Sequence, residues 1–406
     1  MSEIRRPAVV ALVLVVFFVV SLFTNTLGPL IPEIIRAFGL SLTAAGFLPF
    51  AFFVAYGIVS IPAGLWTERS SEKRVMTAAF ALAMVAALAF ATFPGYRVAI
   101  ASFFAMGIAM AAIQVAANTL LRVAGGERSF ALFSTAAQLV FGTGAFVSPR
   151  LYALVAAPEP SPVAAFVARL GPLRWLSLYW LFAACAALMV VVLTLAPLPS
   201  VVRTKDEQTG SLAAHRALLG TRVVPLYFVS IFMYVGSEQG VASWLSQFLA
   251  TYHGVDPRTG GASATSLYWG LLTAGCAAGL VSLRLFDSRK VLLVHSACAM
   301  VLLAVGLLGS GRAASIALPA IGFFASIMWP VIVSLALSSV PAHHGTVSGI
   351  LCTGIVGGAV VPLIVGQLGD WLGLRAGMAF LFLTFGWVFA VGLWARPLPP
   401  RGAAGR

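Results

Sequence analysis

The chain has 406 residues, of which 60% are hydrophobic and only 9% are charged, and its mean hydropathy is +1.00. Soluble domains are roughly half apolar and about one quarter charged, so this composition excludes a soluble fold. The formal net charge is +13, but the longest basic runs contain two residues. A nucleic-acid-binding surface needs clustered basic residues, so that function is excluded as well.

Charged, proline-rich and glycine-rich segments divide the sequence into about twelve apolar stretches of about 20 residues, a length that crosses a hydrocarbon core. The stretches are centred near residues 16, 54, 85, 107, 141, 184, 234, 273, 301, 327, 357 and 385. The first follows Arg5 and Arg6, but no small-residue cleavage site precedes a soluble domain, so we expect a retained helix. The sequence predicts an all-α membrane protein with twelve transmembrane helices.

The loop charges predict the orientation of these helices. An even number of spans places both termini on one side of the membrane. If that side is the cytoplasm, 17 of the 25 Lys and Arg residues are cytoplasmic and 8 are external. This asymmetry agrees with the positive-inside rule. We therefore expect both termini in the cytoplasm.

The chain divides near its middle. Residues 201–222 form the longest polar stretch and follow the sixth span, which predicts a cytoplasmic linker between six-helix bundles at 1–200 and 223–406. A weak internal repeat supports the division, because residues 72–76 enter the third span much as residues 288–292 enter the ninth. Val75 and Val291 differ by 291 − 75 = 216 positions, close to half the chain. Parallel repeats of this kind are typical of transporters with a substrate path between the halves.

Glu238 stands in the middle of the apolar run at residues 225–240, whereas most charges lie at the edges of such runs. An ionisable group at bilayer depth is costly and usually marks an ion, proton or substrate path. The alternative is a carboxyl group that is permanently protonated or paired and only holds the bundle together.

Polar and aromatic residues within several of the predicted spans predict a binding site. Residues 239, 243 and 247 form one polar helical stripe, and residues 114 and 118 form another. Amides both donate and accept hydrogen bonds, and an aromatic ring offers a flat apolar surface, although such residues also serve as helix contacts. The candidate substrate-binding residues are Asn25, Gln114, Asn118, Gln138, Gln239, Ser243, Trp244, Gln247, Tyr268 and Trp329.

Several segments resemble a known family. They are residues 25–32, 114–118, 234–240 and 324–330, and residues 357–362 followed by Gly369 and Asp370. Together with twelve spans, a central loop and basic loops after spans two and eight, they resemble the major facilitator superfamily, and within it the bacterial fucose, galactose and glucose porters. The resemblance implies a secondary transporter of a hexose or deoxyhexose that works by alternating access. It also implies a monomer in the lipid of a bacterial inner membrane, with no enzymatic activity, cofactor or metal.

The departures from this family concern proton coupling and gating. The fucose porter carries proton-linked acids where this chain has Gly28 and Gln114. Glu238 instead matches the glucose and galactose branch, which leaves it as the candidate proton carrier for a symporter. The loop between spans two and three is a degraded form of the superfamily's gating loop. The candidate gating residues there and in the loop after span eight are Glu68, Arg69, Arg74, Asp287 and Arg289.

Two other function classes stay open. An exporter of amphiphilic compounds would carry a Gly-Pro-Gly-Gly signature on span five, which residues 142–149 match poorly. A membrane enzyme or sensor would need a catalytic cluster or a soluble domain, and the sequence indicates neither. No pair of the four cysteines has the short spacing of a metal or redox motif.

The orientation is tested by labelling single cysteines in intact cells with a membrane-impermeant maleimide. We expect a cysteine at Thr259 to react and one at Thr209 to react only after the membrane is opened, because the basic asymmetry places Thr209 inside. Labelling of the Thr209 variant in intact cells would contradict the orientation.

Overall fold

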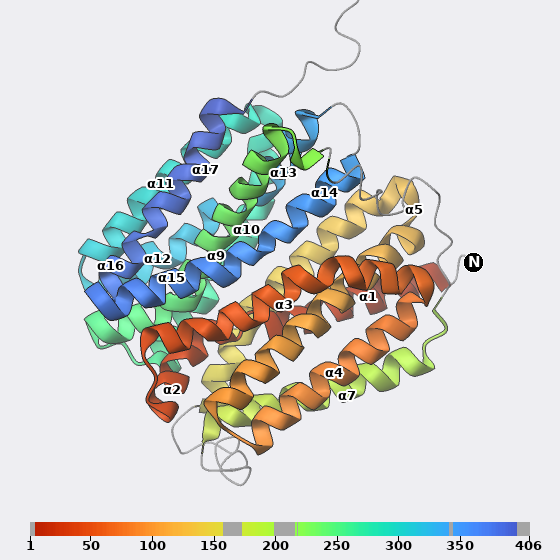
Figure 1. Ribbon diagram of the computed structural model, residues 1–406, viewed down its shortest axis with the longest axis horizontal. Helices are drawn as coiled ribbons and strands as arrows, with labels where there is room; N and C mark the ends of the chain where they lie inside the picture. The colour runs from red at the N-terminus through yellow and green to blue at the C-terminus, as the bar shows by residue number, and fades with distance from the viewer. Residues whose placement is uncertain (1–4, 157–172, 199–215, 217, 341–343, 396–406) are drawn as a thin grey trace, which may run out of the picture.

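The computed structural model is a bundle of helices (Figure 1) and describes residues 5–156, 173–198, 216, 218–340 and 344–395. Eleven stretches of this described part are long and apolar enough to cross a membrane. Helix α9 is not among them, although its 31 residues are long enough, since Glu238 and several amides interrupt its apolar residues. The prediction of an all-α membrane protein is confirmed, and α9 completes the predicted twelve spans.

In the described residues, seven helical elements precede the predicted linker. They are α1 (Arg5–Thr24), α2 (Leu27–Phe38), α3 (Leu42–Arg69), α4 (Glu72–Thr92), α5 (Tyr96–Ala156), η1 (Arg174–Leu176) and α7 (Ser177–Leu195). Helices α1 and α2 form one span with a break between them. Helix α5 contains two spans, at 96–121 and 133–156. Tyr96, at the beginning of α5, bonds to the start of α3, and Tyr152, near its end, bonds to α2, which directly precedes α3. The chain therefore turns back within α5, and both ends of α5 lie at one end of the bundle.

Eleven elements follow the predicted linker in the part of the chain that the structure describes. They are α9 (Val223–His253), η3 (Pro257–Gly261), α10 (Ala262–Leu285), α11 (Ser288–Leu308), α12 (Gly311–Ala325), α13 (Met328–Ser338), α14 (His344–Thr353), η4 (Gly354–Val356), α15 (Gly357–Leu372), α16 (Leu374–Ala379) and α17 (Leu381–Trp394). A break at Ser326 and Ile327 separates α12 from α13 within one span, next to Pro330. Proline lacks an N–H and disturbs the preceding turn, which explains a break here.

The helices of each part of the chain pack together, and the most extensive contacts between the parts come from three helix pairs. Helices α1 to α7 lie on one side of Figure 1 and α9 to α17 on the other. The crossing pairs are α3 with α15, α5 with α10, and α2 with α9. The predicted linker at 201–222 lies mostly outside the described residues, so the domain boundaries remain a prediction. We refer to these two parts as the halves.

Contacts at the start of α4 and α11 repeat with the offset of 216 residues. Ser71 caps α4 and Asp287 caps α11, each by accepting backbone N–H groups of the first turn. Two residues later, Lys73 donates to carbonyls at the end of α7 over 2.8 Å, and Arg289 donates to carbonyls at the end of α17 over 3.1 and 2.8 Å. Each basic side chain thus satisfies carbonyls that a helix end leaves free. The repeat seen in the sequence preserves these two capping functions.

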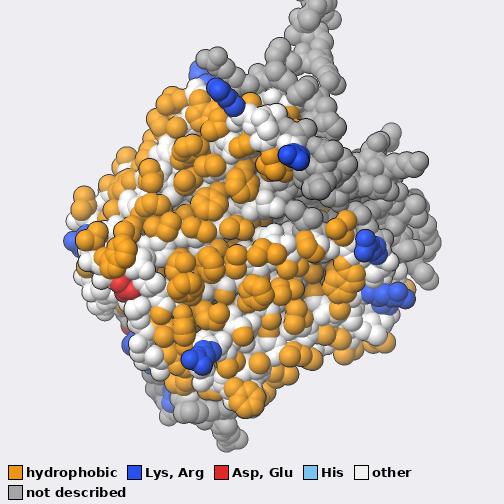
Figure 2. All heavy atoms as spheres, in the orientation of Figure 1, with side chains coloured by type: hydrophobic (Ala, Val, Ile, Leu, Met, Phe, Trp, Pro, Cys, Tyr) orange, Lys and Arg blue, Asp and Glu red, His pale blue; other side chains and the backbone are white. Residues whose placement is uncertain are grey.

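The surface agrees with insertion in lipid. Figure 2 shows one face of the bundle covered largely by hydrophobic side chains, with isolated basic side chains mostly toward its edges. Exposed apolar side chains such as Leu195 and Leu285 lie near helix ends. Lipid, unlike water, does not penalise exposed apolar side chains, so the same residue types occur inside and outside this bundle.

Candidate functional site

Glu238 lies at the midpoint of α9, and the residues on either side of it are buried. Its carboxylate accepts a hydrogen bond from the Tyr234 hydroxyl, one helical turn earlier. The Gln239 amide also donates to it, over 3.2 Å. From α10, the Tyr268 hydroxyl donates to the main-chain oxygen of Glu238 over 3.2 Å. The carboxyl group is therefore held by α9, and α10 contacts the backbone of the same residue.

Trp329 extends this group toward α13. Its ring centroid lies 6.3 Å from that of Tyr234, and the indole is half-buried at the second residue after the break between α12 and α13. Transporters commonly build their sites at such discontinuous helices near the middle of the membrane. We call Tyr234, Glu238, Gln239, Tyr268 and Trp329 the Glu238 cluster.

The chemistry of the cluster suits a neutral polar ligand. In the described part of the chain, no Lys or Arg pairs with Glu238. A proton or an incoming ligand can therefore change its charge balance, which a fixed ion pair would resist. Carboxylate, amide and phenol groups bind hydroxyls, and the half-buried indole offers an apolar surface beside them.

The candidates on α5 stand apart from this cluster. Gln114 is half-buried, while Asn118 and Gln138 are exposed. No hydrogen bond joins them to the Glu238 cluster, and they belong to the other half. An exposed amide within a span faces either lipid or a water-filled space, and only the second is favourable. Their role in binding stays a prediction.

Four other candidates have structural contacts of their own. Asn25 donates to the carbonyl and hydroxyl of Ser21 over 3.0 Å, at the break between α1 and α2. Trp244 is fully buried and donates its indole N–H to the Pro362 carbonyl over 2.9 Å. Ser243 is buried, and the Gln247 amide donates to a threonine one turn later. None of these contacts reaches the Glu238 cluster, and the binding role of these residues stays a prediction.

Two of the candidate gating residues make contacts within their own half. Asp287 and Arg289 make the capping contacts described above, within the second half. Arg69 and Arg74 are exposed, and the side chain of Glu68 lies outside the described residues. Their gating role also stays a prediction.

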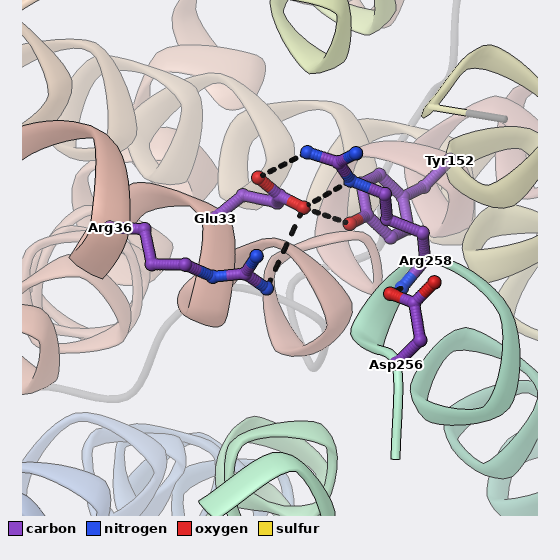
Figure 3. A network of polar contacts seen from close by, with 5 residues as sticks. All are labelled: Glu33, Arg36, Tyr152, Asp256 and Arg258. Atoms are coloured by element: carbon purple, nitrogen blue, oxygen red, sulfur yellow. Dashed lines mark hydrogen bonds and ion pairs between the residues drawn. The ribbon is translucent and has the colours of Figure 1, made fainter. Parts of the chain in front are cut away.

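The sequence analysis missed a polar network between the halves, shown in Figure 3. Glu33 on α2 is only 6% exposed, and its carboxylate accepts hydrogen bonds from Arg258 Nε over 2.7 Å and Arg258 Nη2 over 3.3 Å. Tyr152 on α5 donates to the same carboxylate over 3.4 Å, and Arg36 Nη2 lies 3.8 Å from it. The signal was present, because Glu33 also stands among apolar residues.

Further polar contacts join the halves at this end of the bundle, which we call the Glu33 end. The Asp370 carboxylate on α15 accepts the backbone N–H groups of Leu42 and Thr43, each over 2.8 Å. A carboxylate at a helix N-terminus is stabilised by the helix dipole, and this one belongs to the opposite half. Arg150 on α5 donates to the Ser266 hydroxyl on α10 over 2.8 Å. The Glu33 end is therefore closed.

Gly28 lies at the contact between α2 and α9, where an acid would not fit. A Cβ atom added to it would lie 2.3 Å from the main-chain oxygen of Ala242 in the other half. Backbone atoms cannot yield as a flexible side chain can. The absence of a side chain at Gly28 therefore lets the two halves meet closely here.

We expect Gly28→Ala to open the Glu33 end, because the methyl group would overlap the Ala242 carbonyl. The distance between spin labels at Phe93 and Leu308 measures the opening, since these residues end α4 and α11 and are 71% and 79% exposed. Gly64→Ala is the control, because a Cβ there meets no atom within 4 Å. Equal distance distributions in both variants would contradict the close-contact role.

Comparisons with known proteins were made for the whole chain. Residues 13–355 match the Major Facilitator Superfamily. A glucose/galactose transporter of Brucella abortus is 31% identical over 390 residues, which cover 93% of this chain and 91% of the relative. An L-fucose-proton symporter of Escherichia coli is 25% identical and covers 89% of this chain and 87% of its own length.

The fold also matches solved transporters. A bacterial homologue of the human lysosomal transporter Spinster, in an inward-facing and unoccupied conformation, superimposes with a TM-score of 0.80. The match covers 98% of this chain and 100% of the other, at 15% sequence identity. At this identity the match establishes the shared fold and nothing more.

Proposed function

The chain belongs to the Major Facilitator Superfamily, and we propose that it carries a hexose or deoxyhexose across the membrane by alternating access. It is a transporter that leaves the covalent structure of its substrate unchanged. The relatives named for glucose, galactose and fucose are similar over about nine tenths of the chain, which supports a sugar of this size.

The observation that carries the proposal is the Glu238 cluster. A sugar presents hydroxyls around its rim and C–H groups on its faces. In the cluster, the Glu238 carboxylate and Gln239 amide are hydrogen-bonding groups on α9. The Trp329 ring belongs to α13 and lies beside Tyr234 of α9. Ligand sites combine an apolar wall with a few polar groups in this way. We propose that Trp329 covers a face of the sugar while Glu238 and Gln239 bind its hydroxyls.

Amides of the first half complete the proposed site from the opposite side. Gln114 and Asn118 lie on α5, which belongs to the half that does not contain Glu238. A solute held by groups of both halves would be exposed to each side in turn as the halves rock about it. Candidates on both halves are therefore consistent with this mode of transport.

We propose the orientation that the loop charges predict, with both termini in the cytoplasm of a bacterial cell and the Glu33 end facing outward. The relatives are bacterial proteins, and 17 of 25 basic residues would then lie on the cytoplasmic side. In this orientation the closed Glu33 end corresponds to an inward-facing state. We also propose that one chain is the transporting unit.

Sugar recognition is tested by binding to purified protein. We expect Trp329→Ala to weaken the binding of glucose, galactose or fucose, because loss of the stacked ring typically costs about 1–3 kcal/mol, or about 5- to 150-fold in affinity. Trp371→Ala is the matched control, since that indole is 71% exposed at a helix end. Calorimetry measures both affinities. Equal affinities for the two variants would remove Trp329 from the site.

Proton coupling is tested with Glu238→Gln, which keeps the shape of the side chain and mimics its protonated form. We expect this variant to exchange sugar between equal pools but not to accumulate it in proteoliposomes with an imposed pH gradient. Uptake of radiolabelled hexoses, with and without the gradient, measures both activities.

The outcomes separate transport from coupling. If the wild-type protein transports no hexose or deoxyhexose, the substrate class is wrong. If it equilibrates a sugar but never accumulates it, the protein is a facilitator and Glu238 binds sugar or supports the helix. If Glu238→Gln still accumulates sugar, another group carries the proton.

A further inference from the structure

We propose that His295 on α11 and Cys276 on α10 are positioning residues that hold Trp329 in its place in the Glu238 cluster. Each donates a hydrogen bond to a backbone carbonyl at the break between α12 and α13, a few residues before Trp329. The inference rests on the proposed function, because it assigns two further residues to the support of the same site.

The break leaves a carbonyl without its usual donor. In a continuous helix, each carbonyl accepts a hydrogen bond from the N–H group four residues later. Pro330 has no N–H group, so it cannot supply this bond to the Ser326 carbonyl. At membrane depth, such a carbonyl needs a donor from elsewhere in the protein.

Side chains of two neighbouring helices supply donors to the break. The Cys276 thiol on α10 donates to the Ser326 carbonyl, with the sulfur 3.5 Å from the oxygen. Nδ1 of His295 on α11 lies 3.0 Å from the Phe324 carbonyl oxygen. A carbonyl oxygen can only accept, so the imidazole is the donor and carries a proton on Nδ1. Two carbonyls of the break are therefore tied to two different helices.

The imidazole of His295 is oriented by aromatic rings that precede the break. Its centroid lies 6.5 Å from that of Phe323, with the two planes 18° apart, and 5.4 Å from that of Phe324. Because this packing already fixes the ring, the hydrogen bond to the Phe324 carbonyl costs little additional conformational entropy.

The segment that leads into the break lies directly against the backbone of α10. A Cβ atom added to Gly322 would lie 2.2 Å from the main-chain oxygen of Tyr268. The Tyr268 hydroxyl in turn donates to the main-chain oxygen of Glu238. The position of the break relative to α10 therefore sets the position of Trp329 relative to Glu238.

Both residues act through the backbone of the break. Within the described residues, no hydrogen bond joins either side chain to the Glu238 cluster. The rival explanation is that His295 and Cys276 only fill space between helices. In that case the shape of a substituted side chain decides its effect, whereas in our proposal its hydrogen-bond donor does.

Two pairs of variants separate these explanations. His295→Asn keeps an N–H donor near the position of Nδ1, whereas His295→Leu has nearly the same branched shape and no donor. Cys276→Ser keeps a donor on Cβ, whereas Cys276→Ala removes it. The second pair tests the break independently if a substitution at His295 prevents folding.

The readout is fluorine NMR of the full-length protein in lipid nanodiscs, with fluorotryptophan at its nine tryptophans. Trp329→Phe and Trp371→Phe identify two signals, and Trp371 is the internal control because it is 71% exposed at a helix end. We expect the Trp329 signal to shift or split in His295→Leu and Cys276→Ala. It should keep its wild-type position in His295→Asn and Cys276→Ser, and the Trp371 signal should stay fixed in all four variants.

Calorimetry measures the binding of glucose, galactose or fucose to the same variants. We expect His295→Leu to weaken the affinity about ten-fold, as for an acceptor left without its donor, and His295→Asn to change it less than about two-fold. Cys276→Ala should weaken the affinity less than His295→Leu does, because a thiol is a weak donor.

The fluorine signals decide the proposal. Equal Trp329 signals in His295→Leu and His295→Asn would overturn the role of His295, and equal signals in the Cys276 pair would overturn that of Cys276. A Trp371 signal that moves as much as the Trp329 signal would show a general structural effect and would also overturn the proposal.

These measurements need no sugar, so they decide the positioning of Trp329 even if no hexose binds and the proposed function fails. If the Trp329 signal moves but the sugar affinity does not, the positioning is supported and Trp329 is removed from the proposed sugar site.

Discussion

The hydrocarbon core of a membrane offers no hydrogen-bond partner, so every polar group at that depth must be satisfied within the protein. The span formed by α1 and α2 illustrates this constraint. Where it breaks, Asn25 donates to the Ser21 carbonyl, and Thr26 bonds to the Leu22 carbonyl and to the Ser148 hydroxyl. Side chains thus replace the hydrogen bonds that the break removes. A span can therefore be discontinuous without exposing its backbone, and such spans are where transporters hold their substrates.

The same constraint gives Glu33 and Glu238 different hydrogen-bond partners. Glu238 is satisfied by an amide and a phenol of its own half, which leaves it available to a ligand or proton. Glu33 is satisfied by a guanidinium of the opposite half, which ties its charge to the arrangement of the halves. The two carboxylates therefore differ in whether their hydrogen-bond donors lie within one half or across the two halves.

Repetition organises the rest of the bundle. Lys73 and Arg289, which are 216 positions apart, each bind the carbonyls that end the last helix of their half. These contacts stabilise each half and do not cross between them. The cross-half polar contacts, by contrast, involve residues such as Glu33 and Asp370 that the repeat does not relate. The capping contacts within the two halves are therefore repeated. The polar contacts that join the halves at the Glu33 end are not.

The sequence by itself determined that the protein lies in a membrane, where its spans are, that they repeat at an offset of 216 positions, and that Glu238 stands within an apolar run. Hydropathy, helical period and a charge within an apolar run are local properties of a chain. It also indicated Trp329, which the structure places beside Tyr234. Only the tertiary structure showed that Trp244 is fully buried and bonded to the Pro362 carbonyl, since a buried indole and an exposed indole have the same sequence pattern. It alone paired Glu33 with Arg258, 225 positions away. No local pattern specifies such a partner, because the contact depends on how two separately formed helix bundles meet.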